Sequence, residues 1–173
     1  MRSPRGGRWT IPLLDRGHYC GIEPSADWLD YGLEHFVEPA VREAKQPRFD
    51  HNLNFDMGVF DERFTHVILR SIWTHADKHQ IGQSLDSFRS CAAPEAVMLS
   101  SILPRAPWRR DYKGEGWVGR SHECDAPGMV SHSFRWLHRQ CESRGLKVVP
   151  VPRRPYCSQF WLRVTVRESA GST

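Results

Sequence analysis

The residues with the clearest chemical potential are two glycines near the start of the chain and a carboxylate that follows them. Gly6 and Gly7 lie in a turn, and Glu23 ends the segment His18–Ile22, which has the character of a short strand. A glycine turn lets backbone N–H groups approach a ligand, and the start of the helix after it carries partial positive charge. A carboxylate at a strand end accepts two hydrogen bonds from a ribose diol. The spacing therefore predicts a site for a nucleoside-type ligand.

The segment Arg5–Pro24 resembles the second half of the cofactor signature of class I S-adenosylmethionine-dependent methyltransferases. The block Phe64–Ala76 is similar to the fourth strand of that family and the start of the helix after it. The resemblance implies an enzyme that binds S-adenosylmethionine at Gly6, Gly7 and Glu23. It also implies direct transfer of the methyl group to an oxygen, nitrogen or carbon nucleophile of an acceptor.

Further site residues follow from the same resemblance. Asn52 and Asn54 stand where the family's third strand ends, often at an acid that contacts the adenine amine; asparagine pairs also occur in ordinary turns. Arg70 ends the strand that begins at Phe64, where it either reaches the cofactor carboxylate or emerges at the surface. His75, at the start of the next helix, is the candidate catalytic base, and the alternative is a helix-capping or stacking histidine.

Residues 104–131 are expected to form a long loop above the carboxyl ends of the strands. It holds Tyr112, Trp117 and His122, which we interpret as acceptor-binding residues, because loops of this length are usually functional. The segment Gly114–Gly119 matches the pattern GxGxxG. A dinucleotide site needs a strand directly before this pattern and a helix directly after it. Neither is indicated here, so we assign the segment to the loop.

Hydrophobic periodicity and turn residues predict alternating helices and strands. Helices are expected at 25–45 with a break at Pro39, at 74–91, and from the Ser133 cap to Gly145; strands are expected at 47–51, 64–72, 96–103, 147–151 and 159–166. The apolar run Val67–Leu69 predicts a strand buried on both faces. The segment Thr74–Asp77 resembles a capping box at the start of the second helix.

This alternation predicts an α/β fold with a doubly wound, mostly parallel sheet, and the two consecutive strands at the end predict an antiparallel hairpin. The resemblance implies a Rossmann-like methyltransferase fold in a single domain spanning residues 1–173. The family's first strand precedes the glycine turn, and the chain reaches that turn within five residues of Met1. We therefore expect an N-terminally truncated member that lacks its first central strand, so that the second and fourth strands of the family lose a ladder partner.

Composition places the chain among ordinary globular proteins, with 39% apolar and 25% charged residues. The five cysteines form no CxxC pair, so we expect neither a disulfide framework nor a metal site. No apolar run approaches the ~18 residues that a membrane span needs, and the basic N-terminus lacks the apolar segment of a signal peptide. These features predict a cytoplasmic protein.

Charge is distributed unevenly along the chain. Residues 1–104 hold 11 Lys and Arg against 14 Asp and Glu, whereas residues 105–173 hold 13 against 6. The basic part could meet an acidic substrate or a nucleic acid. Since no aromatic-basic repeat accompanies it, we favour a solvated basic face and a small-molecule or glycan-type acceptor over nucleic acid. The alternative function is a non-catalytic methyltransferase-like fragment or binding module.

Overall fold

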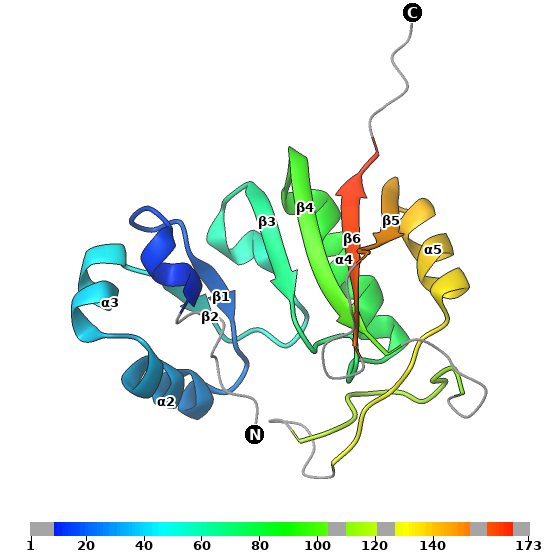
Figure 1. Cartoon of the computed structure of the whole chain (residues 1–173), viewed down its shortest axis with the longest axis horizontal. Coiled ribbons are helices and arrows are strands. Elements are labelled where there is room, and N and C mark those ends of the chain that lie inside the picture. Colours follow the sequence, from blue (N-terminus) through cyan, green and yellow to red (C-terminus); the bar gives the residue numbers. More distant parts are fainter. Residues whose placement is uncertain (1–8, 104–109, 121–126, 153–158, 168–173) are drawn as a thin grey trace, which may run out of the picture. The chain divides into compact units, whose positions relative to one another are not determined.

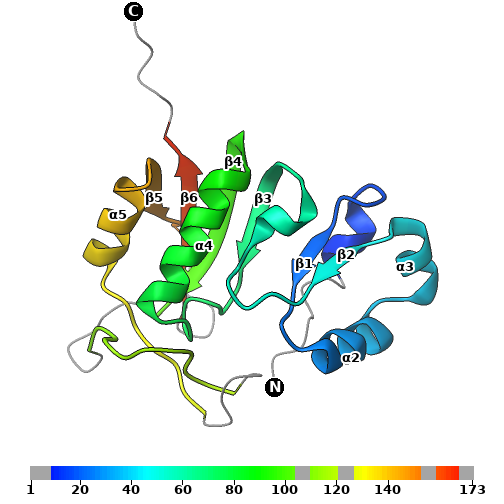
Figure 2. The same cartoon turned by 180° about the vertical axis from the view of Figure 1, so that it is seen from behind.

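The computed structural model describes residues 9–103, 110–120, 127–152 and 159–167 (Figures 1 and 2). The predicted roles of Gly6, Gly7 and His122 therefore lie outside the described residues. The chain divides into two compact units, Met1–Phe60 and Asp61–Thr173. Among the described residues, no helix has the length and apolar character needed to cross a bilayer.

The described residues of the first unit, 9–60, form two strands, two α-helices and two short 3₁₀ helices. In chain order these are η1 (Ile11–Leu13), β1 (Cys20–Ile22), α2 (Ala26–Phe36), α3 (Pro39–Lys45), β2 (Arg48–Asp50) and η2 (Met57–Phe60). The break at Pro39 and the cap at Ser25 are confirmed, because α3 begins at Pro39 and the Ser25 side chain accepts a hydrogen bond from the Trp28 N–H (3.3 Å).

Strands β1 and β2 form a two-stranded parallel sheet. Gly21 in β1 lies opposite Phe49 in β2. A Cβ atom at Gly21 would lie 2.9 Å from two carbons of the Phe49 ring and 3.3 Å from the Tyr19 ring. The small residue in β1 therefore lets two aromatic rings close over the strand. Gly17, with φ +77°, supplies the left-handed turn that leads into β1.

In the second unit, the residues that the structure describes form a four-stranded sheet and two helices. In chain order these are β3 (Phe64–Leu69), α4 (Lys78–Cys91), β4 (Ala92–Ile102), α5 (Phe134–Glu142), β5 (Leu146–Pro150) and β6 (Phe160–Val166). The strand order is β3-β4-β6-β5; β3 and β4 are parallel, and β6 is antiparallel to both of its neighbours. The predicted C-terminal hairpin is confirmed, and its second strand lies between β4 and β5.

Helices α4 and α5 lie on the same side of this sheet, as both views show (Figures 1 and 2). The strand residues on that side are buried, among them Ala96, Met98, Leu162 and Val164. Helix residues complete this core; those that are fully buried include Ile81, Leu85, Phe88 and Leu137. The alternation of buried and more exposed residues along β4 and β6 shows that one face of the sheet carries the core.

Two local predictions are wrong. The strand expected to be buried on both faces is β3, which contains no buried residue, and the Ile68 side chain is 57% exposed. The cause is that β3 has a single strand partner among the described residues and that α4 and α5 cover one face of the sheet. The capping box lies three residues later than predicted: the Asp77 side chain accepts from the Gln80 N–H (2.7 Å), and the Gln80 side chain accepts from the Asp77 N–H (3.0 Å).

The described strands form two separate sheets rather than one. Within the described residues, β1 pairs only with β2, and β3 pairs only with β4. These are the two strands that were expected to lose a partner in a methyltransferase-type sheet without its first central strand. The mixed α/β fold class is confirmed.

Candidate active site

Two acidic residues lie at the carboxyl ends of the parallel strands β1 and β2: Glu23 directly follows β1, and Asp50 is the last residue of β2. The backbone N–H of Glu23 donates to the backbone carbonyl of Asp50 (3.0 Å), so the two residues are direct neighbours. The ring of His51 donates through Nδ1 to the Glu23 carbonyl (2.6 Å) and ties the two strand ends together. In open α/β sheets, ligands bind beyond the carboxyl ends of the strands, which is where this pair lies.

The Glu23 side chain is held at the start of α2. Its Oε1 atom accepts a hydrogen bond from the Ser25 N–H (3.1 Å), and the Ser25 hydroxyl in turn caps the helix. The carboxylate therefore lies where helix α2 has its partial positive charge. This position keeps the acid at the strand end in a defined place.

Asn52 is engaged within its own turn. Its side-chain NH₂ donates to Asp50 Oδ1 (2.6 Å) and to the Asp56 carbonyl (3.0 Å), and its Oδ1 accepts from the Asp56 N–H (2.9 Å). Asn54 is exposed. The acid at the end of β2 is Asp50, which the sequence reading passed over although it is the last residue of the strand.

The Asp50 carboxylate accepts the Asn52 backbone N–H (2.8 Å) as well as the Asn52 side chain. These two hydrogen bonds lower the pKa of Asp50 below its usual value, and the backbone hydrogen bond has the larger effect. Asp50 is therefore ionised at neutral pH and able to accept a hydrogen bond from an amino group. Asn52 acts here on Asp50, and its predicted contact with adenine stays a prediction.

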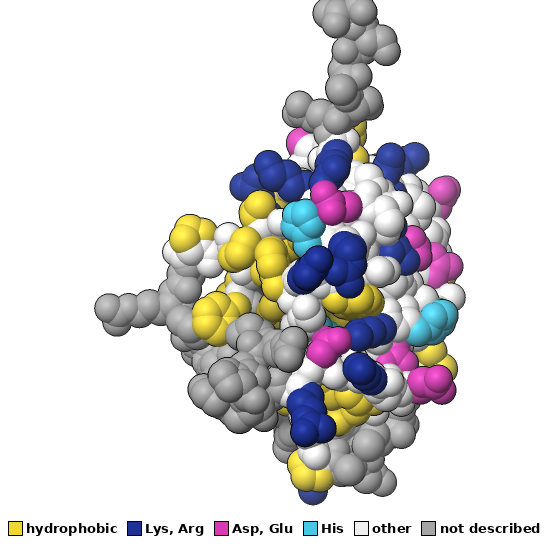
Figure 3. Space-filling model, turned by 90° about the vertical axis from the view of Figure 1, so that its right-hand side faces the viewer, with side chains coloured by type: hydrophobic (Ala, Val, Ile, Leu, Met, Phe, Trp, Pro, Cys, Tyr) yellow, Lys and Arg dark blue, Asp and Glu magenta, His cyan; other side chains and the backbone are white. Residues whose placement is uncertain are grey.

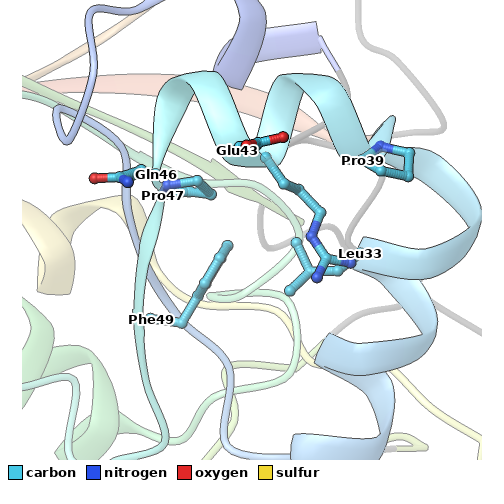
Figure 4. A pocket seen from close by; sticks show the side chains of 7 residues that line it. Leu33, Pro39, Glu43, Gln46, Pro47 and Phe49 are labelled. Atoms are coloured by element: carbon cyan, nitrogen blue, oxygen red, sulfur yellow. The ribbon is translucent and has the colours of Figure 1, made fainter.

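A cavity of the first unit lies between its helices α2 and α3 and strand β2. It has a volume of about 590 Å³, and its lining includes Leu33, Pro39, Pro47 and Phe49 with Arg42 among the polar residues. Figure 4 shows Phe49 rising from β2 into the space below α3. Neither Glu23 nor Asp50 lines this cavity, so we do not assign it to the nucleoside site.

Beyond the carboxyl end of β3, the chain adopts a left-handed conformation at Ser71, with φ +58°. The Ser71 N–H donates to Ser101 Oγ (2.7 Å), and both hydroxyls donate to Gln159 Oε1 (3.0 and 2.8 Å). Arg70, directly before this turn, is exposed, which leaves both interpretations of its role open. Ser71, Ser101 and Gln159 form a polar cluster that the sequence did not indicate, because its members are far apart in the chain.

His75 is enclosed rather than presented to solvent. Its side chain is 5% exposed, its Nδ1 donates to the Val118 carbonyl (2.5 Å), and its ring stacks on Trp117 with 5.4 Å between ring centroids. This is the stacking histidine that the sequence left open as the alternative. The catalytic role of His75 stays a prediction.

The described part of the 104–131 loop is anchored on the segment that follows β3. The Val118 N–H donates to the His75 carbonyl (2.9 Å), and the Val130 N–H donates to the Thr74 carbonyl (2.8 Å). The Gly116 N–H donates to Asp77 Oδ2. Trp117, in the loop that the sequence predicts to bind the acceptor, therefore packs against His75 within the second unit.

Cations on the second unit are mixed with acids. Figure 3 shows Lys and Arg side chains together with Asp, Glu and hydrophobic side chains on this face. Arg144 pairs with Asp86 (2.7 Å), and Arg167 pairs with Glu142 (2.8 Å). This mixed surface fits a solvated basic face better than a continuous track for a nucleic-acid backbone. No group of three metal-ligating side chains occurs among the residues that the structure describes.

Comparison with solved structures identifies close matches in fold. The structure described as the DhpI-SAH complex superposes with a TM-score of 0.63 and 16% identity, over 95% of this chain and 74% of that chain. The glycopeptide N-methyltransferase MtfA with S-adenosyl-L-methionine superposes with a TM-score of 0.62 and 16% identity, over 92% of this chain and 82% of that chain. DesVI of Streptomyces venezuelae superposes with a TM-score of 0.56 and 14% identity, over 85% of this chain and 73% of that chain.

Neither a protein-family model nor a curated protein sequence matches the chain. At 14–16% identity, these matches define the fold through the arrangement of strands and helices rather than through shared side chains. The chain therefore has the Rossmann-like fold of S-adenosylmethionine-dependent methyltransferases.

Proposed function

We propose that the protein binds S-adenosylmethionine and transfers its methyl group to a small-molecule or glycan-type acceptor. Support comes from the fold, because the structures similar to it include MtfA with S-adenosyl-L-methionine and MtfA with sinefungin. Support also comes from the pair of acids at the carboxyl ends of β1 and β2. This pair is the observation that carries the proposal.

In the proposed site, the Glu23 carboxylate accepts hydrogen bonds from the ribose hydroxyls. Asp50 accepts a hydrogen bond from the adenine amine, and Asn52 holds the Asp50 carboxylate in place. Asn54, in the same turn, also contacts the adenine amine. Gly6 and Gly7 supply backbone N–H groups to the cofactor. These roles use the chemistry that each group has: ionised acids accept hydrogen bonds, and backbone amides donate them.

When bound, the cofactor supplies an electrophilic methyl group on a sulfonium. The task of the chain is then to hold the acceptor in line with that group and to exclude water, since alignment alone lowers the barrier substantially. His75 already donates to Val118 and is enclosed by Trp117. We therefore place the main role of His75 in fixing the 104–131 loop rather than in taking a proton.

Calorimetric titration of the whole chain with S-adenosylmethionine and with sinefungin tests the proposal. Glu23→Gln keeps one oxygen for Ser25 but loses the charge and the two-oxygen contact with the ribose, so we expect affinity to fall about 10-fold or more. Asp30→Asn is the matched control, because Asp30 is an exposed acid of α2. Equal affinity for Glu23→Gln and wild type would remove Glu23 from the site.

A non-catalytic binding module is the second candidate function. The observation that favours it is that, in the described residues, β1 and β3 each have a single strand partner. Absence of heat and of a thermal shift with either cofactor ligand, in a sample that melts cooperatively, would support this candidate. Saturable binding of S-adenosylmethionine would contradict it.

A further inference from the structure

A cavity of about 340 Å³ lies between the two legs of the long loop in the second unit. One leg contributes residues 110–113 and the other residues 129–131, and Leu103, directly after β4, also lines the cavity. Its volume lies at the lower end of the range found for small-molecule sites. The nucleoside site proposed above uses none of these residues.

The walls of this cavity are fixed by hydrogen bonds between the two legs. The Tyr112 N–H donates to the Ser131 carbonyl (2.9 Å), and the Ser131 hydroxyl donates to the Arg110 carbonyl (2.8 Å). The Tyr112 hydroxyl donates to the carbonyls of Glu115 and Gly116 (3.3 Å each). The cavity is therefore built into the fold of the loop rather than being a gap between loose segments.

The charge at the cavity is positive. Arg110 and Lys113 line it, both are exposed, and within the described residues neither forms an ion pair. Asp111, the acid among the described lining residues, is already engaged: Oδ2 accepts from Lys78 Nζ (2.7 Å) and Oδ1 accepts from the Ser133 N–H (2.8 Å). Its charge is therefore balanced by Lys78, and the two cations remain available to a ligand.

The electrostatics of the neighbouring groups agree with this assignment. Burial would raise the pKa of Asp111, but the hydrogen bonds from Lys78 and Ser133 and the charge of Lys78 outweigh it, so the pKa is lowered. Burial and the charges of Asp77 and Glu115 raise the pKa of Tyr112, so its phenol stays neutral. The cavity keeps both of its cations without gaining a further negative charge.

We propose that this cavity holds the anionic end of the methyl acceptor, with Arg110 and Lys113 binding a carboxylate or a phosphate-type group. The apolar part of the lining, Leu103, Met129 and Val130, takes the hydrocarbon body next to that group. The acceptor is therefore a small organic acid. This assignment rests on the proposed methyl transfer, and it gives a role to the basic charge of residues 105–173.

The test uses ¹H–¹⁵N spectra of the whole chain titrated with benzoate, phenylphosphonate and benzamide. Benzamide matches benzoate in shape and lacks its charge. We expect the two acids to shift amide resonances of residues 110–113 and 129–131 saturably, and benzamide to bind at least 10-fold more weakly. Tighter binding of one acid than of the other identifies the carboxylate or the phosphate-type group as the ligand chemistry.

The double variant Arg110→Gln/Lys113→Gln should weaken binding of the acids at least 10-fold. The control Arg139→Gln/Lys147→Gln removes two exposed cations from α5 and β5 and should leave binding within twofold. The proposal would be overturned if benzamide bound as tightly as the acids, or if the control variant lost as much affinity as Arg110→Gln/Lys113→Gln. Resonance shifts confined to residues outside 110–113 and 129–131 would also overturn it.

Titration with S-adenosylmethionine in parallel separates the two ideas. Failure of the acids to bind a chain that does bind S-adenosylmethionine would remove this inference and leave the proposed function intact. Binding of the acids by a chain that does not bind S-adenosylmethionine would overturn the acceptor assignment.

Discussion

The ring of His75 occupies the space in which a side chain at position 119 would begin. A Cβ atom on Gly119 would lie 2.5 Å from His75 Nδ1 and 2.6 Å from the Gly128 carbonyl oxygen, and Gly119 has φ +108°. The loop can therefore close over His75 only with glycine at this position. This contact joins the segment after β3 to the 104–131 loop.

Gly119→Ala should destabilise the protein more than Gly116→Ala. Both glycines have positive φ, but a Cβ atom at Gly116 meets nothing within 4 Å. We expect about 1–2 kcal/mol of backbone strain for Gly116→Ala and about 1–3 kcal/mol more for Gly119→Ala, from crowding against His75. Urea denaturation of both variants measures the difference, and equal losses would show that the contact with His75 is not tight.

Ser101→Ala should cost about 1–3 kcal/mol of unfolding free energy. The Ser101 hydroxyl is fully buried, accepts the Ser71 N–H and donates to Gln159, so its removal takes this acceptor from the Ser71 N–H and one of two hydroxyl donors from Gln159 Oε1. Ser143→Ala is the control, since Ser143 is exposed and its hydroxyl bonds only a carbonyl of its own helix. A Ser101→Ala variant as stable as this control would contradict the cluster.

His132 makes stability depend on pH. Burial lowers its pKa from 6.5, and its ring donates through Nε2 to the Ala76 carbonyl (3.0 Å). Above pH 6.5 both the folded and the unfolded forms are neutral at this residue. As pH falls through 6.5 the unfolded chain binds a proton first, so the free energy of unfolding decreases. Chemical denaturation should therefore give lower stability at pH 5.5 than at pH 7.5.

Replacement of this histidine identifies the titrating group. His132→Gln keeps a donor for Ala76 and cannot titrate, so its stability should change less between the two pH values. His138→Gln, at an exposed position, should keep the wild-type dependence. The lowered pKa values of Asp50 and Asp111 affect stability only as pH falls through the acidic range, below this window.

Cys141 should resist alkylation in the native protein. Burial raises the pKa of its thiol to about 12, so at neutral pH its thiolate fraction is roughly 1000-fold below that of an ordinary thiol. Cys20 is only half-buried. A short iodoacetamide pulse followed by peptide mass spectrometry should label Cys20 well before Cys141. In urea the two should react alike, and rapid native labelling of Cys141 would contradict its burial.

Most of the helices and strands could be predicted from the sequence, because each has a local signal. Ser25 and Pro39 mark where α2 and α3 begin. In the second unit, the apolar run after Pro94 indicates β4, and Gly145 marks the turn after α5. The order of these elements is sufficient to indicate the fold. Local signals also explain the error at Thr74, since Asp77 and Gln80 form an equally valid capping box.

The partners of each strand could not be predicted in the same way. The apolar run at Val67–Leu69 resembles a fully buried strand, yet burial depends on what lies beside and above it, and Ile68 is exposed. The cluster of Ser71, Ser101 and Gln159 depends on contacts between residues up to 88 positions apart. Nothing in the local sequence around any of the three indicates the other two.

The position of β6 has a consequence for how the second unit is made. Since β6 lies between β4 and β5, the strand β5 has no hydrogen-bonding partner until residues 160–166 have been synthesised. The strands β3, β4 and β5 therefore leave the ribosome before the sheet of the second unit can close. In that interval β4 and β5 each lack β6 as a neighbour, which makes the folding of this unit late and exposes it to aggregation.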